Sequence, residues 1–295
     1  MGSLRIIINK IKDNPYLLLI PAVVFITIFY ITPNIMNYYY SFTDWSNFKE
    51  EINFVGLTNF KELFLQGDIF RYIFNTLEYA VFVAIMMNVV GLTLACALEK
   101  TSNVNSLFRA AFFLPILVSP IAAVYLFIAI YSPNGPINQL LGFLTGREIN
   151  FGFLSSQTWT LFFITIIHAW KWFPITMVVY IAGLNAIPED LIESAKIEGA
   201  SYWKIFTKIK LPLLGPALTF NIVITLIGSL SAFEIVMPIR GGPGGATTVL
   251  NYFVYLKYST GNLGGTVAVS AVMLMLIVGL AIPFVLFLRS REVEL

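Results

Sequence analysis

Six long apolar stretches, separated by polar segments, dominate the hydrophobic pattern of this 295-residue chain. Each is long enough to cross about 30 Å of hydrocarbon as an α-helix. Because the runs are unbroken rather than alternating, a transmembrane β-barrel is excluded. The pattern predicts an all-α membrane protein with six transmembrane helices over residues 16–40, 76–98, 110–131, 159–184, 213–236 and 266–288. Prolines within these runs predict kinks at Pro21, Pro115, Pro120, Pro174 and Pro283.

The lysine and arginine positions predict how these helices are oriented. With the N-terminus inside the cell, eleven of these residues fall in inner segments and six in outer ones, with Lys171 inside a span. This bias predicts a cytoplasmic N-terminal segment (1–15), a transmembrane domain (16–288) and a cytoplasmic tail (289–295). No small-residue cleavage site follows the first apolar run, so we expect that run to be retained as a span.

Composition supports a membrane protein and excludes several functions. The chain is 58% hydrophobic and 12% charged, with a net charge of +2, so nothing favours nucleic acid binding. Its one cysteine, Cys96, has no partner for an intramolecular disulfide and no metal-ligand pattern around it. The sequence has no phosphate-binding loop, no nucleophile-base pairing and no zinc-protease motif. We therefore expect no catalysis by this chain.

One charged segment between the fourth and fifth spans, residues 193–212, interrupts the apolar pattern. Before it, Pro188, Glu189 and Asp190 are typical of a helix start, where acidic side chains suit the helix dipole. Gly199 lies where one short helix can end and a second begin at an angle. Two interpretations are open: an amphipathic helix lying on lipid headgroups, or a surface that docks another protein.

The residues of this segment resemble a known signature. Glu193, Ser194 and Ala195, then Gly199, then Ile209, Leu211 and Pro212 match the pattern E-A-A-x3-G-x9-I-x-L-P of ABC importer permeases, with Ser194 as the one departure. The resemblance implies coupling helices in the cytoplasmic segment 185–212 that sit in a cleft of the ATP-hydrolysing subunit. The docking surface would comprise Glu193, Ser194, Ala195, Gly199 and Ala200, and Ile209, Leu211 and Pro212 would lead into the next span.

The same resemblance implies the type I importer permease fold in a bacterial or archaeal cell membrane. It implies four kinds of partner: a second homologous permease subunit, two ATP-binding subunits, an extracellular solute-binding protein and the lipid bilayer. ATP and Mg²⁺ would be bound by the ATPase subunits, and no cofactor is expected in this chain. The alternative is a secondary transporter or channel without ATPase partners, although no acidic residue lies deep within a span and no repeat is evident.

Other stretches resemble the carbohydrate branch of these permeases. They are residues 54–60 (FVGLTNF) with Asn75 and Thr76, residues 182–188 (AGLNAIP), and Phe233-Glu234 followed by Gly241-Gly242-Pro243. The tryptophan common in the third span of such permeases is missing here. The resemblance implies a sugar, oligosaccharide or related solute. The glycine-rich residues 240–248 predict a tight turn or re-entrant element on the outer face, with contact to the binding protein or gating as a hypothesis.

Polar residues within the fourth and fifth spans are the candidates for a substrate path, because polar groups in a membrane usually face the bundle interior. Asn221, Thr225 and Ser229 recur every four residues, which also suits hydrogen bonding between helices. Lys171 could face a cavity, pair with Glu234, or extend outward to the membrane surface. A cavity-facing lysine would favour an anionic substrate. The full set is His168, Trp170, Lys171, Trp172, Asn221, Thr225, Ser229, Phe233 and Glu234.

Overall fold

A computed structural model of the chain describes residues 15–65, 67–290 and 292. The expected cytoplasmic location of residues 1–14 and most of the expected tail, residues 291 and 293–295, lie outside the described residues. The described chain is helical, with two isolated antiparallel bridges, Thr43–Phe54 and Ser46–Asn262, as its extended pairing. It forms two compact units: residues 15–65 with 254–272, and residues 67–253 with 273–292.

The first unit contains the predicted first span and the loop after it. The span is one helical stretch, Ile20–Tyr40, made of α2 (Ile20–Ile26), a π-helical turn and α3 (Thr32–Tyr40). After the loop, α4 (Thr58–Leu65) begins inside the FVGLTNF stretch. Asn59 lies on α4 and donates to the carbonyls of Ser41 and Thr43 at 2.9 and 2.8 Å. The resemblance motif therefore has a structural use here, as it fastens α4 to the end of the first span.

Asp44 stabilises the same loop. Its carboxylate accepts hydrogen bonds from Lys49 Nζ and the Asn53 amide, both at 2.7 Å. The Lys49 hydrogen bond, followed by that of Asn53, holds the pKa of Asp44 below its ordinary value. The carboxylate is thus in its charged form when it closes the loop.

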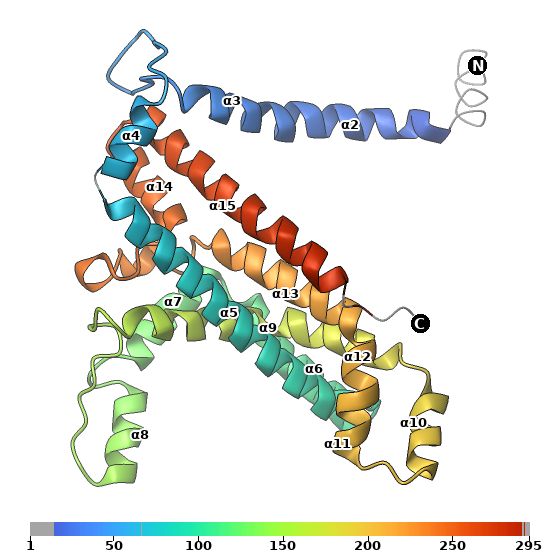
Figure 1. Ribbon diagram of the computed structural model, residues 1–295. Helices are drawn as coiled ribbons and strands as arrows, with labels where there is room; N and C mark the ends of the chain where they lie inside the picture. The colour runs from blue at the N-terminus through green and yellow to red at the C-terminus, as the bar shows by residue number, and fades with distance from the viewer. Residues whose placement is uncertain (1–14, 66, 291, 293–295) are drawn as a thin grey trace, which may run out of the picture. The chain divides into compact units, whose positions relative to one another are not determined.

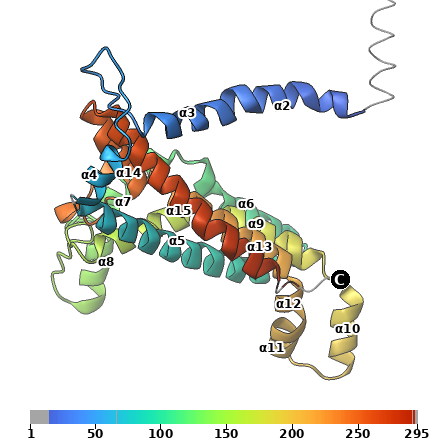
Figure 2. The same ribbon diagram turned by 45° about the horizontal axis from the view of Figure 1, so that its top comes forward.

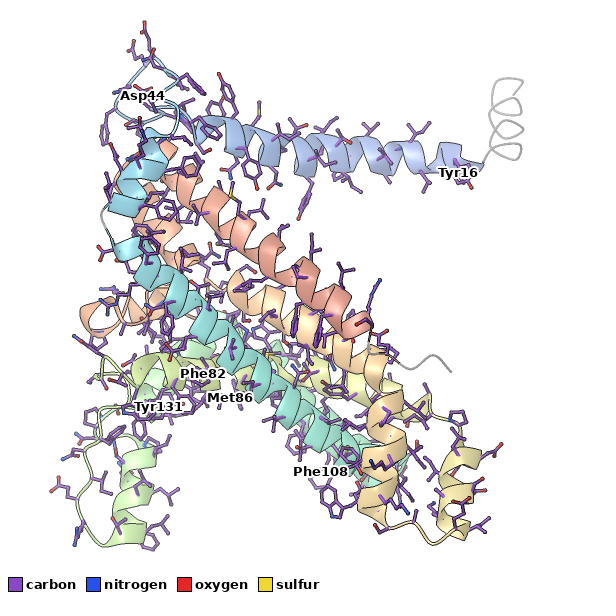
Figure 3. All side chains as sticks on the ribbon, viewed as in Figure 1. Tyr16, Asp44, Phe82, Met86, Phe108 and Tyr131 are labelled. Carbon is purple, nitrogen blue, oxygen red and sulfur yellow. The ribbon has the colours of Figure 1, made fainter. Side chains whose placement is uncertain are left out.

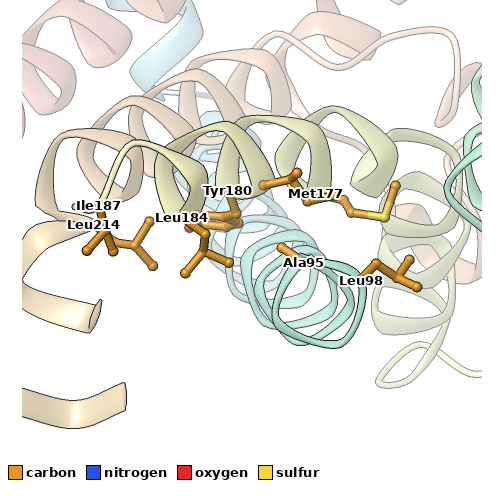
Figure 4. Packing of buried hydrophobic residues seen from close by; sticks show 8 residues of the cluster. Ala95, Leu98, Met177, Tyr180, Leu184, Ile187 and Leu214 are labelled. Carbon is orange, nitrogen blue, oxygen red and sulfur yellow. The ribbon is translucent and has the colours of Figure 1, made fainter. Parts of the chain in front are cut away.

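Three helices make the centre of the second unit: α5 (Asp68–Leu98), α9 (Thr160–Asn185) and α13 (Gly215–Leu230). Helices α5 and α9 lie side by side in both views (Figures 1 and 2). Near the middle of α5, Phe82 packs edge-on against Phe162, and Met86 accepts a hydrogen bond from Thr165 (Figure 3). Nearer the end of α5, Ala95 and Leu98 pack with Met177, Tyr180 and Leu184 of α9 (Figure 4). This apolar packing makes the α5–α9 pair the frame of the unit.

Four helices are long and apolar enough to cross a membrane, and the number reaches six if each of two bent pairs is one span. The four are Ile20–Tyr40, α5, α9 and α15 (Leu263–Arg289). The remaining helices are α6 (Asn103–Phe113), α7 (Pro120–Ile130), α8 (Pro136–Thr145), α10 (Glu189–Ile197), α11 (Tyr202–Ile205), α12 (Leu211–Leu213) and α14 (Leu250–Ser259). Helices α14 and α15 each contain residues of both units.

The predicted third span is not one helix. Helix α6 with its following 3-10 turn, Leu114–Leu117, meets α7 at an angle of 97°. Pro120 begins α7, and Ser119 before it is extended (φ −56°, ψ 138°), because proline disfavours the helical conformation of the preceding residue. The proline kinks predicted at Pro115 and Pro120 are therefore realised as a full break. By contrast, α9 and α15 continue through Pro174 and Pro283, and Pro21 lies at the start of α2.

The predicted fifth span is also bent and shorter than expected. The stretch Tyr202–Leu213 meets α13 at 67°. Helix α13 ends at Leu230, so residues 231–236, placed within the span by their hydropathy, form turns instead. The second span is instead longer than predicted, because its helix begins at Asp68 rather than at residue 76. At 31 residues α5 is about 46 Å long, well over the thickness of the hydrocarbon layer.

Candidate functional site

The coupling segment forms the two short helices that its sequence predicts. Helix α10 has Glu189 and Asp190 in its first turn and Lys196 in its last, which complements the helix dipole. Gly199 ends it with a positive φ of 77°, which glycine adopts without the steric cost of a side chain. Its amide donates to the Lys196 carbonyl at 3.0 Å. The chain then turns into α11, so the predicted break at Gly199 is confirmed.

The α10–α11 segment presents an exposed surface with apolar side chains. Within the described chain, Ile197 is 88% exposed and Trp203 is 71% exposed. The signature residues lie beside them: Glu193, Ser194 and Gly199 are exposed, and Ala195 and Ala200 are partly buried. Ile209 and Leu211 are partly buried and Pro212 is exposed. Figures 1 and 2 place α10 and α11 at the opposite end of the α5–α9 pair from α8.

An ion pair joins this segment to the end of α5. Lys210 lies just before α12, and its Nζ contacts both carboxylate oxygens of Glu99 at 2.6 and 2.7 Å. Both side chains are largely buried, with 9% of Lys210 and 20% of Glu99 exposed. From α6, Arg109 donates to the carbonyls of Leu98 and Glu99. The terminal turn of α5 is therefore held from two sides, by a charge from the coupling segment and by a guanidinium group from α6.

We expect Lys210→Glu to lower the stability of the protein by about 3–5 kcal/mol, because it would leave two carboxylates facing each other in a buried site. The double variant Glu99→Lys with Lys210→Glu should recover much of that loss. Thermal unfolding of the purified protein in detergent measures both effects. Lys208→Glu is the matched control, since Lys208 is exposed on the same turn. A double variant no more stable than Lys210→Glu would contradict a direct pairing.

Asn75 and Thr76 of α5 hold the glycine-rich loop. The sequence pattern around these two residues did not predict this contact. Asn75 Nδ2 donates to the carbonyls of Thr248 (3.1 Å) and Gly245 (3.4 Å), and Thr76 Oγ1 accepts from the Leu250 amide at 2.8 Å. Within the loop, Gly241, Gly242, Gly244, Gly245 and also Arg240 have positive φ angles. The predicted tight turn with unusual backbone angles is therefore present, and α5 supports it directly.

A cavity of about 450 Å³ lies among α5, α7, α9, α13 and the turn after α13. This volume is within the range of small-molecule sites. Its walls are mostly apolar, with aromatic faces from Trp172 and Phe233. Polar groups come from His168 and Glu234 and from several hydroxyl side chains: Thr176, Thr225 and Ser231.

The cavity brings together five of the nine candidate path residues. His168, Trp172, Thr225, Phe233 and Glu234 line it. The other four, Trp170, Lys171, Asn221 and Ser229, are not among its lining residues. Trp170 packs against Phe127 of α7, with ring centroids 5.2 Å apart. A direct role of the lining residues in binding stays a prediction.

The polar stripe of α13 makes hydrogen bonds to the neighbouring helices. Asn221 Nδ2 donates to the Thr176 carbonyl of α9 at 3.1 Å, and Thr225 Oγ1 accepts from Asn88 Nδ2 of α5 at the same distance. Asn88 also accepts from the hydroxyl of Tyr180 on α9. Thr225 therefore belongs to both the helix-joining network and the cavity wall, which the four-residue spacing alone left open. Hydrogen bonds between helices, such as these, give a bundle a specific packing.

Lys171 is buried, with 1% of its surface exposed, and fastens the broken third span. Its Nζ donates to the Ile116 carbonyl at 3.0 Å and to the Val118 carbonyl. Both carbonyls lie just before the start of α7, Ile116 in the 3-10 turn that follows α6 and Val118 directly after that turn, where the helical ladder is interrupted. The ammonium also lies over the Trp172 ring, 4.7 Å from its centroid. The side chain of Lys171 therefore points into the bundle and does not extend outward to the membrane surface.

Comparisons with known proteins agree on one kind of protein. The family described as "Binding-protein-dependent transport system inner membrane component" matches residues 87–291. The chain is 31% identical to the "Probable ABC transporter permease protein YurN" of Bacillus subtilis, covering 97% of this chain and 100% of that one. It is 30% identical to the "Probable starch degradation products transport system permease protein AmyD" of Thermoanaerobacterium thermosulfurigenes, over 95% of each chain.

One further relative and one solved structure are similar to this chain. The chain is 31% identical to the "sn-glycerol-3-phosphate transport system permease protein UgpA" of Escherichia coli, over 94% of each chain. Among solved structures, a chain of a bacterial alginate ABC transporter, in complex with an alginate pentasaccharide-bound periplasmic protein, superposes with a TM-score of 0.79. Its sequence identity is 24%, covering 95% of this chain and 94% of that chain. At that identity the likeness shows a shared fold.

Proposed function

We propose a role for this chain from the premise that it belongs to the family of binding-protein-dependent transport system inner membrane components. It is a multi-pass membrane permease subunit of an ABC importer, a transport protein and not an enzyme. On that basis its cargo is a sugar, an oligosaccharide or a related solute, moved by alternating access. Relatives named for starch degradation products and for trehalose and maltose support the carbohydrate class. The aromatic and hydroxyl lining of the cavity suits it as well, since rings pack on the apolar faces of sugars.

The observation that carries the ATP-driven mechanism is the exposed α10–α11 segment with the coupling signature. In our proposal it docks into an ATPase subunit through Glu193, Ser194, Ala195, Gly199 and Ala200. The complete importer would hold a second homologous permease, two ATP-binding subunits and an extracellular solute-binding protein. ATP and Mg²⁺ would be bound by the ATPase subunits. Docking of this kind requires the segment, and with it both chain termini, to be cytoplasmic.

The ion pair between Lys210 and Glu99 offers a route for the motion. When the ATPases close, α10 and α11 would move with them as a rigid element. Lys210 follows α11 and is bonded to the end of α5, so the displacement would reach the α5–α9 pair and the cavity wall that it forms. A contiguous chain of contacts of this kind can carry coupling between distant sites. Hydrolysis would then return the cavity to its inward-open state.

Affinity purification of this chain from its native membrane tests the proposal. We expect an ATP-binding subunit and a second permease to co-purify, and uptake of a radiolabelled saccharide into vesicles to require both ATP and the binding protein. Inclusion of a proton ionophore in the uptake assay is the control, and it should leave the rate unchanged. Uptake that follows an ion gradient and ignores ATP would instead support a secondary transporter.

A further inference from the structure

Helix α8 (Pro136–Thr145) has an exposed apolar face. Leu140, Phe143 and Leu144 are 58%, 85% and 69% exposed, and their spacing of three and four residues places them on one side of the helix. Asn138 and Thr145 lie on the opposite side, and no residue of α8 is charged. With ten residues α8 is about 15 Å long, too short to cross the hydrocarbon layer. This composition is typical of a helix that lies on a surface.

Asn138 fastens the polar side of α8 to the neighbouring loop. The side chain is 2% exposed. Its Nδ2 donates to the carbonyls of Ser132 and Phe151, both at 3.0 Å, and its Oδ1 accepts from the Phe151 amide at 3.1 Å. None of the long helices of the described chain packs along α8. Since the apolar residues lie on the side opposite Asn138, that face is directed away from the attachment.

The attachment lies at the level where α9 begins. Phe153, two residues after Phe151, packs against Phe163 in the first turn of α9 and against Tyr131 at the end of α7, with ring centroids 4.8 and 5.2 Å apart. Trp159, directly before α9, is exposed. Aromatic residues gathered at the end of a spanning helix mark the boundary between hydrocarbon and headgroups. From this boundary α8 leads away from the bundle and across the direction of α9 (Figures 1 and 2). It therefore runs along the membrane surface.

A lipid leaflet suits the apolar face of α8 better than a soluble protein does. The helix has no charge that could steer a soluble partner or fix its orientation. Acyl chains accept apolar side chains without a matching shape. The same lipid would continue from the adjacent α7, where Ile121, Tyr125 and Leu126 are also exposed apolar residues. Helices with one apolar face bind in this way, with that face buried about 5–10 Å below the headgroups.

We propose that α8 is an interfacial helix, and that Leu140, Phe143 and Leu144 insert into the leaflet at the end of the bundle opposite the α10–α11 segment. If that segment is cytoplasmic, this is the outer leaflet. The inference goes beyond the proposed function, since it names a partner of a different surface and requires only that the chain is a membrane permease. Through Asn138, α8 would hold the ends of α7 and α9 at a fixed depth in the membrane.

Fluorescence quenching from two sides of α8 tests this proposal. Cys96→Ser removes the one cysteine of the chain, and Phe143→Cys or Thr145→Cys is then labelled with bimane. The protein is purified with its associated subunits and placed in phosphatidylcholine nanodiscs. Thr145 is the matched control, because it is exposed on the opposite side of the same helix. We expect lipid with a nitroxide at the fifth acyl carbon to quench the label at position 143 about threefold more strongly than the label at 145, and aqueous iodide to show the reverse order.

Equal lipid quenching at the two positions, or stronger iodide quenching at position 143 than at 145, overturns the proposal. A label at 143 that is shielded from both quenchers would show that a protein covers the face, which overturns it as well. Leu144→Cys repeats the test independently and should behave as Phe143→Cys does, since both residues lie on the apolar side. The measurement requires neither substrate nor ATP, so its failure would leave the proposed transport function intact.

Discussion

Replacing Gly199 by valine is expected to reduce the amount of ATPase subunit that co-purifies with this permease about tenfold and to reduce ATP-driven uptake in proportion. Gly199 has a φ of 77°, and a β-branched residue in this region costs about 1–2 kcal/mol, which corresponds to a factor of about 5–30. A Cβ at this position meets nothing within 4 Å. The cost therefore falls on the angle between α10 and α11 and not on the packing of the protein. Quantitative immunoblotting of the purified complex measures it.

Gly146→Val is the matched control for this experiment. Gly146 caps α8 with a φ of 67°, is exposed, and also has open space around its Cβ. It carries the same backbone strain at the other end of the α5–α9 pair, so ATPase binding should be retained. Gly199→Asn should lose less of the ATPase subunit than Gly199→Val and more than Gly146→Val, because asparagine tolerates the left-handed region better than valine. Equal loss of the ATPase in Gly199→Val and Gly146→Val would contradict a specific role of the α10–α11 turn.

Lys171→Met is expected to lower the free energy of unfolding by about 2–4 kcal/mol. The variant keeps the apolar stem but removes the donor that serves the carbonyls of Ile116 and Val118, and buried carbonyls without a partner are destabilising. Thermal unfolding in detergent measures this loss. Uptake should show a lower maximal rate with little change in the substrate concentration for half-maximal rate, because Lys171 positions the break of the third span and is not in the cavity wall.

Lys61→Met provides the baseline for Lys171→Met, since Lys61 is exposed on α4 and its replacement should change stability by less than about 0.5 kcal/mol. Lys171→Arg should recover part of the stability, because a guanidinium group can also donate to two carbonyls. A Lys171→Met protein of unchanged stability but weakened affinity for an anionic solute would show that the lysine binds substrate instead.

Much of the architecture could be predicted from local pattern alone. Hydrophobic runs located all six candidate spans because burial in lipid requires about 20 apolar residues wherever a helix crosses. The α10–α11 turn was predictable because a glycine with its flanking charges acts locally, through backbone freedom and the helix dipole. The ends of the spans were less predictable. Hydropathy includes residues 231–236 in the fifth span, whereas the helix ends at Leu230.

The contacts between segments could not be predicted from such patterns. Asn75 and the glycine-rich loop are about 170 residues apart in the chain, yet Asn75 donates to the Thr248 carbonyl. The four-residue spacing of Asn221, Thr225 and Ser229 suits both a cavity and an interhelical network. Only the position of Asn88, which donates to Thr225, and the place of Thr225 in the cavity wall show that Thr225 serves both. Hydrogen bonds of this kind depend on which helices are neighbours, and periodicity carries no such information.

Lys171 and Glu234 illustrate the same division between sequence and tertiary structure. The sequence by itself determined that one lysine lies inside a span and one glutamate near the end of another, together with the coupling signature that relates the chain to ABC importer permeases. It left open whether the lysine faces a cavity, because a charge in a membrane can be satisfied by substrate, by an acid or by the membrane surface. The tertiary structure decided the matter by breaking the third span beside Lys171, where free carbonyls satisfy the ammonium group, while Glu234 remains in the cavity wall.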